Sequence, residues 1–160
     1  MPIRLGHDVF IDGQISETNI NRICDAMLSY ALMMKVYDIE IYKAYATSAM
    51  REAKNGKDVV KKVMKKSGIN IEIIDGKTEA ELLFNTELGD FIQDEKIYLY
   101  VDVGGGSTEL TLLKDNKVFT SKSFEVGTVR LLENKVSPNT FNEMKAVSYT
   151  HLRAHETPEH

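Results

Sequence analysis

The sequence predicts an α/β fold with a mixed sheet flanked by helices. Helical and strand-like stretches alternate over residues 16–90, which is typical of strands joined by helices. Three strand-like stretches then follow one another over residues 96–126, and Asp115-Asn116 between the last two predicts an antiparallel turn. The chain has 160 residues, 42% of them hydrophobic, and this is enough to bury a core.

The first helix is expected to begin at Ser16, a favourable N-cap, because apolar residues follow at three- and four-residue steps. These residues are Ile20, Ile23, Met27, Ala31 and Met34. The second helical stretch is broken at Asn55-Gly56, and Pro138 stands just inside the start of the last. The helical stretches cover residues 16–38, 48–68, 76–90, 126–136 and 139–147. The strand stretches cover residues 39–48, 70–75, 96–103, 108–113 and 117–126.

Composition excludes several classes of protein. The net charge of −4 argues against a general nucleic-acid-binding surface, although a local cationic pocket for a polyanion remains compatible with it. No apolar run approaches the ~18 residues that would span a bilayer. The single Cys24 cannot form an internal disulfide, so the cytoplasm is the default location. One domain is expected over residues 1–147, followed by a non-native or disordered tail at 148–160, where apolar periodicity is lost.

The stretch VDVGGGSTE, residues 101–109, has two interpretations. In the first, Gly104, Gly105 and Gly106 bring backbone N–H groups to a phosphate, Ser107 and Thr108 add hydroxyl donors, and Asp102 and Glu109 orient Mg²⁺. In the second, the glycines form a turn between two strands. The first is favoured because a hairpin rarely needs three glycines. A P-loop lacks its lysine here, and a nucleophile elbow lacks its second glycine.

Three further strand-to-helix junctions carry groups suited to an anion, and each also has a purely structural interpretation. Ser48 and Arg51 could bind phosphate, or they could cap a helix and face solvent. Glu79 could activate a water, although an acid near a helix start is the simpler interpretation. Gly127 and Thr128 could form a second oxyanion cradle or a tight turn. Together with the glycine stretch, these three junctions at the carboxyl ends of strands favour a bound polyanion.

These stretches together resemble the Ppx/GppA phosphatase family, the exopolyphosphatases and guanosine pentaphosphate phosphohydrolases. The resemblance implies a ribonuclease H-like fold of the actin, Hsp70 and sugar kinase superfamily. The matching segments are RLGHDVFIDGQIS (4–16), ATSAMREAKNG (46–56), IEIIDGKTEAELLF (71–84), YVDVGGGSTELTL (100–112) and SFEVGTVRLLE (123–133).

The resemblance also implies roles for individual residues. Glu79 falls on the family's general base for the attacking water, and Arg51 falls on its phosphate-contacting arginine. Gly104 to Thr108 fall on a phosphate loop, while Asp102 and Glu109 take acidic positions associated with Mg²⁺ and the water. The implied reaction is hydrolysis of the terminal phosphoanhydride bond of inorganic polyphosphate, or of pppGpp to ppGpp. The complete protein is expected to be a homodimer.

One departure from the family pattern bears on activity. Family members carry an Asp-x-Gly-Ser-Asn type phosphate loop ahead of the segment matched by residues 4–16, and a second domain that closes the cleft. We expect this chain to be truncated at both ends and to have little or no turnover of its own. A polyphosphate- or nucleotide-binding regulator that does not cleave is the alternative, followed by a sugar-kinase-like phosphotransferase.

Overall fold

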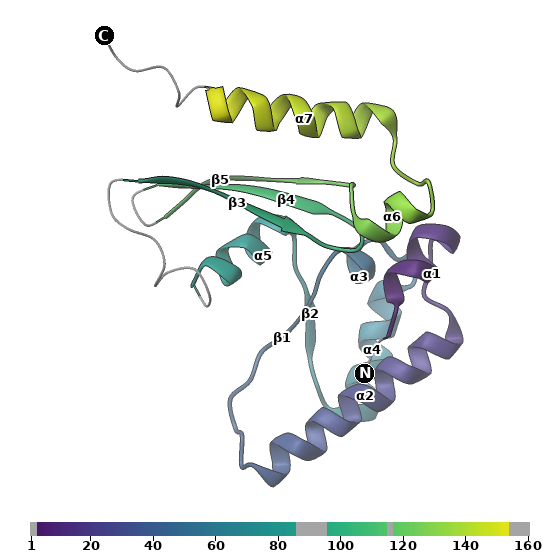
Figure 1. Cartoon of the computed structure of the whole chain (residues 1–160). Coiled ribbons are helices and arrows are strands. Elements are labelled where there is room, and N and C mark those ends of the chain that lie inside the picture. The colour runs from purple at the N-terminus through teal and green to yellow at the C-terminus, as the bar shows by residue number, and fades with distance from the viewer. Residues whose placement is uncertain (1–2, 86–95, 115–116, 154–160) are drawn as a thin grey trace. The chain divides into compact units, whose positions relative to one another are not determined.

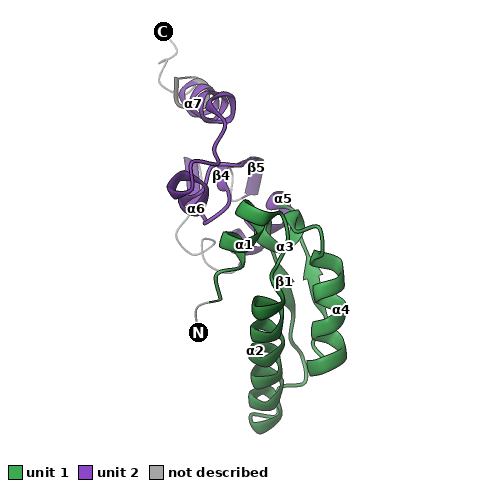
Figure 2. Ribbon diagram, turned by 90° about the vertical axis from the view of Figure 1, so that its right-hand side faces the viewer, with its two compact units in different colours: residues 1–75 green, residues 76–160 purple. Residues whose placement is uncertain are grey.

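The computed structural model describes residues 3–85, 96–114 and 117–153. The chain divides into two compact units, residues 1–75 and 76–160 (Figure 2). Each unit is described by itself, and the single domain expected over residues 1–147 stays a prediction. None of the described helices is long and apolar enough to cross a membrane.

The first unit contains four helices and a pair of parallel strands (Figure 1). The strands pair with Ala44 opposite Ile71 and Ala46 opposite Ile73. Helices α2 and α4 pack against each other, and Val59 and Val63 of α4 are almost completely buried. The elements are α1 (Leu5–Asp12), α2 (Glu17–Val36), β1 (Ala44–Ala46), α3 (Ser48–Glu52), α4 (Gly56–Ser67) and β2 (Ile71–Ile73).

The start of α2 confirms the N-cap predicted at Ser16. The Ser16 hydroxyl accepts a hydrogen bond from the N–H of Asn19, which satisfies one of the free donors in the first turn. Asp8 of α1 supports this cap, because its Oδ2 atom accepts from the Ser16 N–H at 2.9 Å and from Asn19 Nδ2 at 2.8 Å. One carboxylate therefore joins α1 to the cap of α2.

Replacing Asp8 with asparagine is expected to destabilise the protein by about 1–2 kcal/mol at neutral pH, because hydrogen bonds to a charged acceptor are lost. Burial raises the pKa of Asp8, but the hydrogen bonds from Ser16 and Asn19 and the charge of His7 outweigh burial and hold the pKa below its ordinary value. A carboxylate with a lowered folded-state pKa stabilises the fold above its unfolded pKa, and this contribution is lost as the pH falls through the folded value.

Urea unfolding of the wild type and Asp8→Asn at a series of pH values checks this expectation. The difference in unfolding free energy should be full at pH 7 and should shrink below about pH 4, where the unfolded carboxyl becomes protonated. Asp12→Asn, at the exposed end of the same helix, is the control and should leave stability unchanged. A difference that does not depend on pH would contradict the assignment to the carboxylate.

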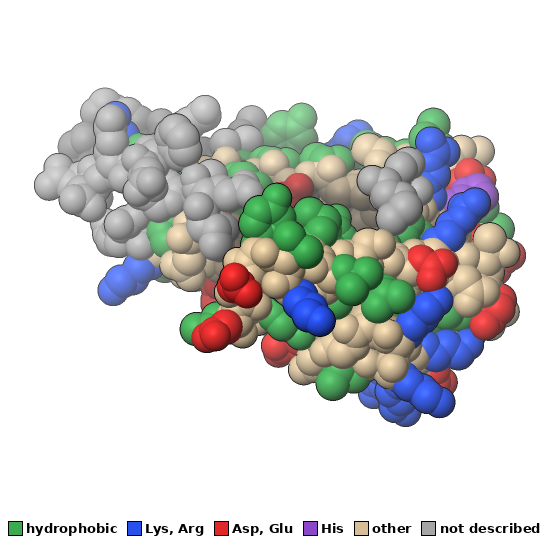
Figure 3. Space-filling view, turned by 90° about the horizontal axis from the view of Figure 1, so that it is seen from below, with side chains coloured by type: hydrophobic (Ala, Val, Ile, Leu, Met, Phe, Trp, Pro, Cys, Tyr) green, Lys and Arg blue, Asp and Glu red, His purple; other side chains and the backbone are tan. Residues whose placement is uncertain are grey.

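Two expectations for the first unit are only partly met. Ile20 and Ile23 are buried as predicted, but burial in α2 ends at Ala26, so Ala31 and Met34 are only half-buried. The strand expected over residues 39–48 shortens to Ala44–Ala46, with Ile41 91% exposed. Apolar side chains lie open among charged ones on the face shown in Figure 3. Apolar periodicity indicates which face of a segment favours burial. In the second half of α2 and in residues 39–43, no described neighbour covers that face.

The second unit is built on a three-stranded antiparallel sheet in the order β3-β4-β5. This confirms the meander expected from the sequence, although the turn predicted at residues 115–116 lies outside the described residues. The predicted helix end near residue 89 also lies outside them. The elements are α5 (Gly76–Leu83), β3 (Ile97–Val103), β4 (Thr108–Lys114), β5 (Lys117–Phe124), α6 (Thr128–Leu132) and α7 (Pro138–Arg153).

Alternation along the strands divides their side chains between two faces. One face packs against α7, where Leu110, Phe124 and Val126 form an apolar cluster with side chains of that helix. The other face packs against α5 (Figure 1). Strand β4 lies between the other two strands, and its residues 108–113 are all buried. The central strand is thus covered on both faces and along both edges.

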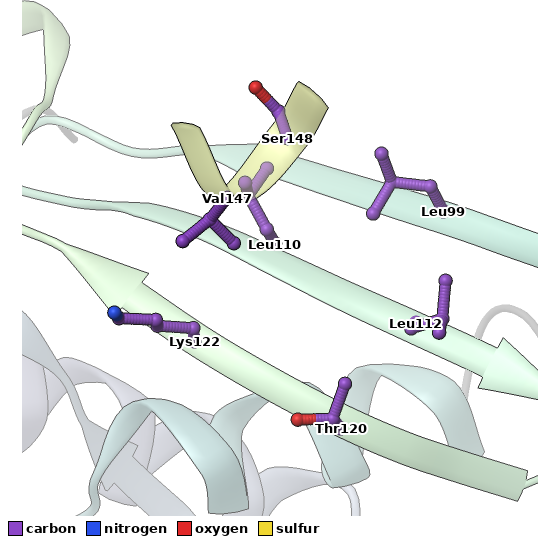
Figure 4. A pocket seen from close by; sticks show the side chains of 7 residues that line it. All are labelled: Leu99, Leu110, Leu112, Thr120, Lys122, Val147 and Ser148. Atoms are coloured by element: carbon purple, nitrogen blue, oxygen red, sulfur yellow. The ribbon is translucent and has the colours of Figure 1, made fainter. Parts of the chain in front are cut away.

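A cavity of about 200 Å³ lies on the α7 face of the sheet (Figure 4). Apolar side chains from β3, β4 and α7 form most of its wall, and Lys122 of β5 lies at its side. The lining residues are Leu99, Leu110, Leu112, Thr120, Lys122, Val147 and Ser148. None of the predicted site residues lines it.

The C-terminal helix extends beyond its predicted end. Helix α7 begins at Pro138, as expected, but continues through residues 148–153, which were expected to belong to a disordered tail. Residues 154–160 lie outside the described part of the chain.

Candidate functional site

The second unit places the two predicted metal-binding acids side by side. Asp102 near the end of β3 and Glu109 near the start of β4 are direct partners in the antiparallel pairing, so their side chains leave the same face of the sheet. Ser123 of β5 is the partner of Glu109 on its other side. The three residues form one row across the sheet, on the face that packs against α5.

Glu109 is a buried carboxylate with a defined hydrogen-bond donor. Its side chain is only 4% exposed, whereas Asp102 is half-buried. The Ser123 hydroxyl donates to Glu109 Oε1 at 2.7 Å. Burying a charge is costly unless it is hydrogen-bonded or bound to a cation, and the Ser123 hydroxyl supplies one such hydrogen bond.

Helix α5 begins beside this buried carboxylate. A Cβ added to Gly76, the first residue of α5, would lie 3.7 Å from Glu109 Oε1 and 3.1 Å from the Cβ of Ser123. The positive end of the helix dipole therefore lies near a negative charge, which is a favourable arrangement. Glu79 lies in the first turn of the same helix, half-buried, with its Oε2 atom shielded from solvent.

The glycine stretch forms the hairpin loop between β3 and β4, as the structural interpretation of the sequence proposed. The pair Val103–Thr108 closes the hairpin, and the N–H of Gly104 donates to the carbonyl of Ser107 at 2.9 Å. Gly104 and Gly105 do not have positive φ angles, which are a common reason for glycine in a turn; among the described glycines these occur at Gly13 and Gly68. Close contact with a neighbouring segment explains Gly105 better.

That neighbour is the turn from Gly127 into α6. The N–H groups of Thr128 and Val129 donate to the carbonyl oxygens of Gly104 at 3.0 Å and Gly105 at 2.9 Å. A Cβ on Gly127 would lie only 2.4 Å from the Gly105 carbonyl oxygen. Gly127 and Thr128, expected to bind phosphate, thus hold the glycine loop in this structure, and their direct contact with phosphate stays a prediction.

Hydrogen bonds from two further side chains hold the glycine loop and the chain next to it. Arg130 of α6 is buried, 8% exposed, and its Nε donates to the carbonyl of Gly106 at 2.7 Å. The Thr108 hydroxyl donates to the carbonyl of Val126 at 2.5 Å, so its proton is directed to the backbone rather than into the loop, where a phosphate donor was expected. Ser107 is also buried, 6% exposed.

Ser48 and Arg51 belong to the first unit and are described within it. Ser48 is the first residue of α3, and Thr47, the N-cap, makes no side-chain capping bond. Arg51 Nη1 donates to the carbonyl of Ile74, just beyond β2, at 2.6 Å. The arginine side chain is therefore oriented toward the carboxyl end of β2.

The acidic pair fits the needs of a magnesium ion. Mg²⁺ keeps several of its waters and is usually held by one or two carboxylates. Asp102 and Glu109, opposite each other on adjacent strands, supply such a pair. The described residues contain no cluster of three or more His, Cys, Asp or Glu side chains that could hold a metal. Two carboxylates with oxygen donors only are the kind of ligand that suits a hydrated Mg²⁺.

A model of the Ppx/GppA phosphatase family matches residues 2–157. The chain belongs to this family. The Ppx/GppA chain is 32% identical over 151 residues to exopolyphosphatase 2 of Mycobacterium tuberculosis, covering 89% of this chain and 46% of that protein. It is 34% identical over 134 residues to the bifunctional 3-dehydroquinate synthase/phosphatase of Fusobacterium nucleatum, covering 82% of this chain and 20% of that protein.

Solved structures of the Ppx/GppA family confirm the fold. The Aquifex aeolicus family member superposes with a TM-score of 0.72 at 25% identity, covering 98% of this chain and 52% of that one. An exopolyphosphatase from Cytophaga hutchinsonii gives a TM-score of 0.70 at 31% identity, over 76% of this chain and 39% of that one. The α/β fold of the Ppx/GppA family expected from the sequence is thus confirmed. The chain spans about half or less of the length of these relatives.

Sequence reasoning missed two residues that the structure joins to the site. Ser123 had no assigned role, because only the register of β5 against β4 shows that it faces Glu109. Arg130, part of the segment SFEVGTVRLLE, was given no role, and the structure buries it against the carbonyl of Gly106 in the glycine loop. Alternation along residues 117–124 would have placed Ser123 on a polar face, but it could not have named its partner.

Proposed function

We propose that a full-length protein carrying this sequence hydrolyses the terminal phosphoanhydride bond of inorganic polyphosphate. The observation that carries this proposal is the buried Glu109 opposite Asp102, at the base of a hairpin loop of glycines, in a chain of the Ppx/GppA family. The family is one of phosphoanhydride hydrolases, and relatives named exopolyphosphatases favour polyphosphate over pppGpp as the substrate.

The glycine loop is suited to hold the phosphate chain. Glycines expose backbone N–H groups that an anion can approach closely. The hydrogen bonds that Thr128, Val129 and Arg130 donate to carbonyl groups of the loop, which we call the clasp, keep the loop in one shape. A loop fixed in advance costs no reorganisation when charge develops on the phosphoryl oxygens. Ser107 belongs to the same loop, and contacts of Gly127 and Thr128 with phosphate stay predictions, as does the phosphate contact of Ser48 in the first unit.

Acidic residues take the remaining roles. Asp102 and Glu109 would hold Mg²⁺, which when bound neutralises phosphate charge and orients the terminal group. Glu79 would accept a proton from the attacking water as general base, and its position in the first turn of α5 places it on the helix that begins beside Glu109. Arg51 would offset the negative charge of the phosphate chain. We expect a cytoplasmic homodimer, with no nucleic-acid partner.

Phosphate release from two substrates tests the proposal. A full-length protein with Mg²⁺ should release phosphate from polyphosphate, and more slowly from pppGpp, and removal of the metal with a chelator should abolish both reactions. Faster release from pppGpp would reverse the substrate assignment. Tight binding of polyphosphate with no release would favour the non-cleaving regulator, and phosphate transferred to a sugar would favour a phosphotransferase.

A further inference from the structure

Ser123 occupies a point where three parts of the proposed site meet. Its hydroxyl donates to Glu109 Oε1 at 2.7 Å, and its Cβ lies where a side chain on Gly76 would come within 3.1 Å. Gly76 is the first residue of α5, the helix that carries Glu79 in its first turn. A single small residue of β5 thus bonds to the buried acid of β4 and lies next to the start of the helix.

The geometry of the acidic pair explains why such a contact would be needed. Asp102 and Glu109 are direct cross-strand partners, and like charges in that position repel each other. A carboxylate that only packing restrained would turn away from its neighbour when no cation is present. The Ser123 hydroxyl gives Oε1 of Glu109 a fixed donor and so holds the side chain in one orientation.

We propose that Ser123 is a positioning residue for the metal: its hydroxyl holds the Glu109 carboxylate in the orientation that lets Glu109 and Asp102 share one cation. This inference rests on the proposed function, in which these two acids hold Mg²⁺. The role is indirect, since Ser123 acts through Glu109. Residues that orient metal ligands typically change metal affinity by about 10–100-fold when they are removed.

The sheet provides a matched control two residues away. Ser121 lies on the same face of β5 and also bonds across to β4, where its hydroxyl and that of Thr111 are 2.8 Å apart. Like the Ser123 contact, this is a cross-strand hydrogen bond made by a serine hydroxyl of β5, but it involves no carboxylate. Removing the Ser121 hydroxyl therefore measures the effect of losing a cross-strand hydrogen bond without touching Glu109.

Titration of the 160-residue chain with Mn²⁺, followed by electron paramagnetic resonance, tests the proposal without relying on turnover. Ser123→Ala is expected to weaken Mn²⁺ binding by about tenfold or more, whereas Ser121→Ala should bind as the wild type does. Ser123→Cys, which keeps the volume but donates weakly, should fall between wild type and Ser123→Ala. Urea unfolding of each variant shows that it is folded, and Ser123→Cys replaces Ser123→Ala if the latter is not.

The outcomes separate this inference from the proposed function. If Glu109→Gln abolishes Mn²⁺ binding but Ser123→Ala does not weaken it, the positioning role is overturned and the metal site stands. If Ser121→Ala weakens binding as much as Ser123→Ala, the effect belongs to the sheet and the inference is also overturned. If the wild type itself binds no Mn²⁺, both the inference and the proposed metal site are overturned.

Discussion

Replacing Glu79 with glutamine in a full-length protein that carries this sequence is expected to lower the rate of phosphate release about 10²–10⁴-fold, the usual contribution of a general base. Glutamine keeps the shape of the side chain but cannot accept the proton of the attacking water. Polyphosphate binding should persist, because the proposed contacts with phosphate lie elsewhere. Initial rates of phosphate release and calorimetric titration with polyphosphate measure the two effects separately.

Glu81→Gln is the matched control for this prediction. Glu81 lies two residues along the same helix, is exposed, and has Lys77 Nζ at 3.9 Å from its Oε1 atom. Residues two apart on a helix point in different directions, so Glu81 should not reach the water that Glu79 serves, and its variant should keep the wild-type rate. A Glu79→Gln rate that stays within about threefold of the wild type would show that Glu79 is not the base.

Gly127→Ala is expected to destabilise the second unit by about 3 kcal/mol or more, since overpacking against atoms that cannot move is costly. A Cβ on residue 127 would lie 2.4 Å from the carbonyl oxygen and 2.5 Å from the carbonyl carbon of Gly105. Both are backbone atoms, so the strain cannot be relieved by turning a side chain. The loop would have to move away from the turn that clasps it, and polyphosphate binding should weaken as well.

Urea unfolding measures the loss of stability, and Gly104→Ala in the same loop supplies the comparison. A Cβ on Gly104 would meet its nearest atom, the Ser107 carbonyl oxygen, at 3.4 Å, an ordinary contact. Its effect on stability should therefore be small. A loss for Gly127→Ala as small as that for Gly104→Ala would mean that the loop moves easily, which would contradict the hydrogen bonds described between the loop and residues 128–130.

Local patterns in the sequence were sufficient to predict most elements of the fold. The N-cap at Ser16, the break before Gly56 and the meander of β3, β4 and β5 each depend on neighbouring residues, and the structure confirms them. Helix α1 was missed because Arg4, its N-cap, makes no capping bond. Periodicity does not predict how the elements divide into compact units, because it shows which side chains favour burial but not which elements bury them.

The part of the site formed by residues close together in the sequence was predicted, and the part formed by distant residues was not. Asp102, Glu109 and the glycines between them are close in sequence, so a short hairpin brings them together. Ser123 reaches Glu109 only through the register of β5, which a shift of one residue would have reversed. The hydrogen bonds from Thr128 and Arg130 end on carbonyl oxygens 24 residues away in sequence. Every residue has a backbone carbonyl, so the sequence does not show which carbonyl will accept such a bond.

The burial of β4 on both faces has a consequence for how the site withstands thermal fluctuation. Amide hydrogens exchange with solvent when their segment opens, and a strand covered on both faces and both edges opens only when most of the unit unfolds. Glu109 belongs to this central strand, whereas Asp102 and Ser123 belong to the outer strands, which open more readily. Local opening of an outer strand therefore moves Asp102 or Ser123 away from Glu109 while Glu109 stays in place. When the strand pairs again, its residue returns to the same position opposite Glu109.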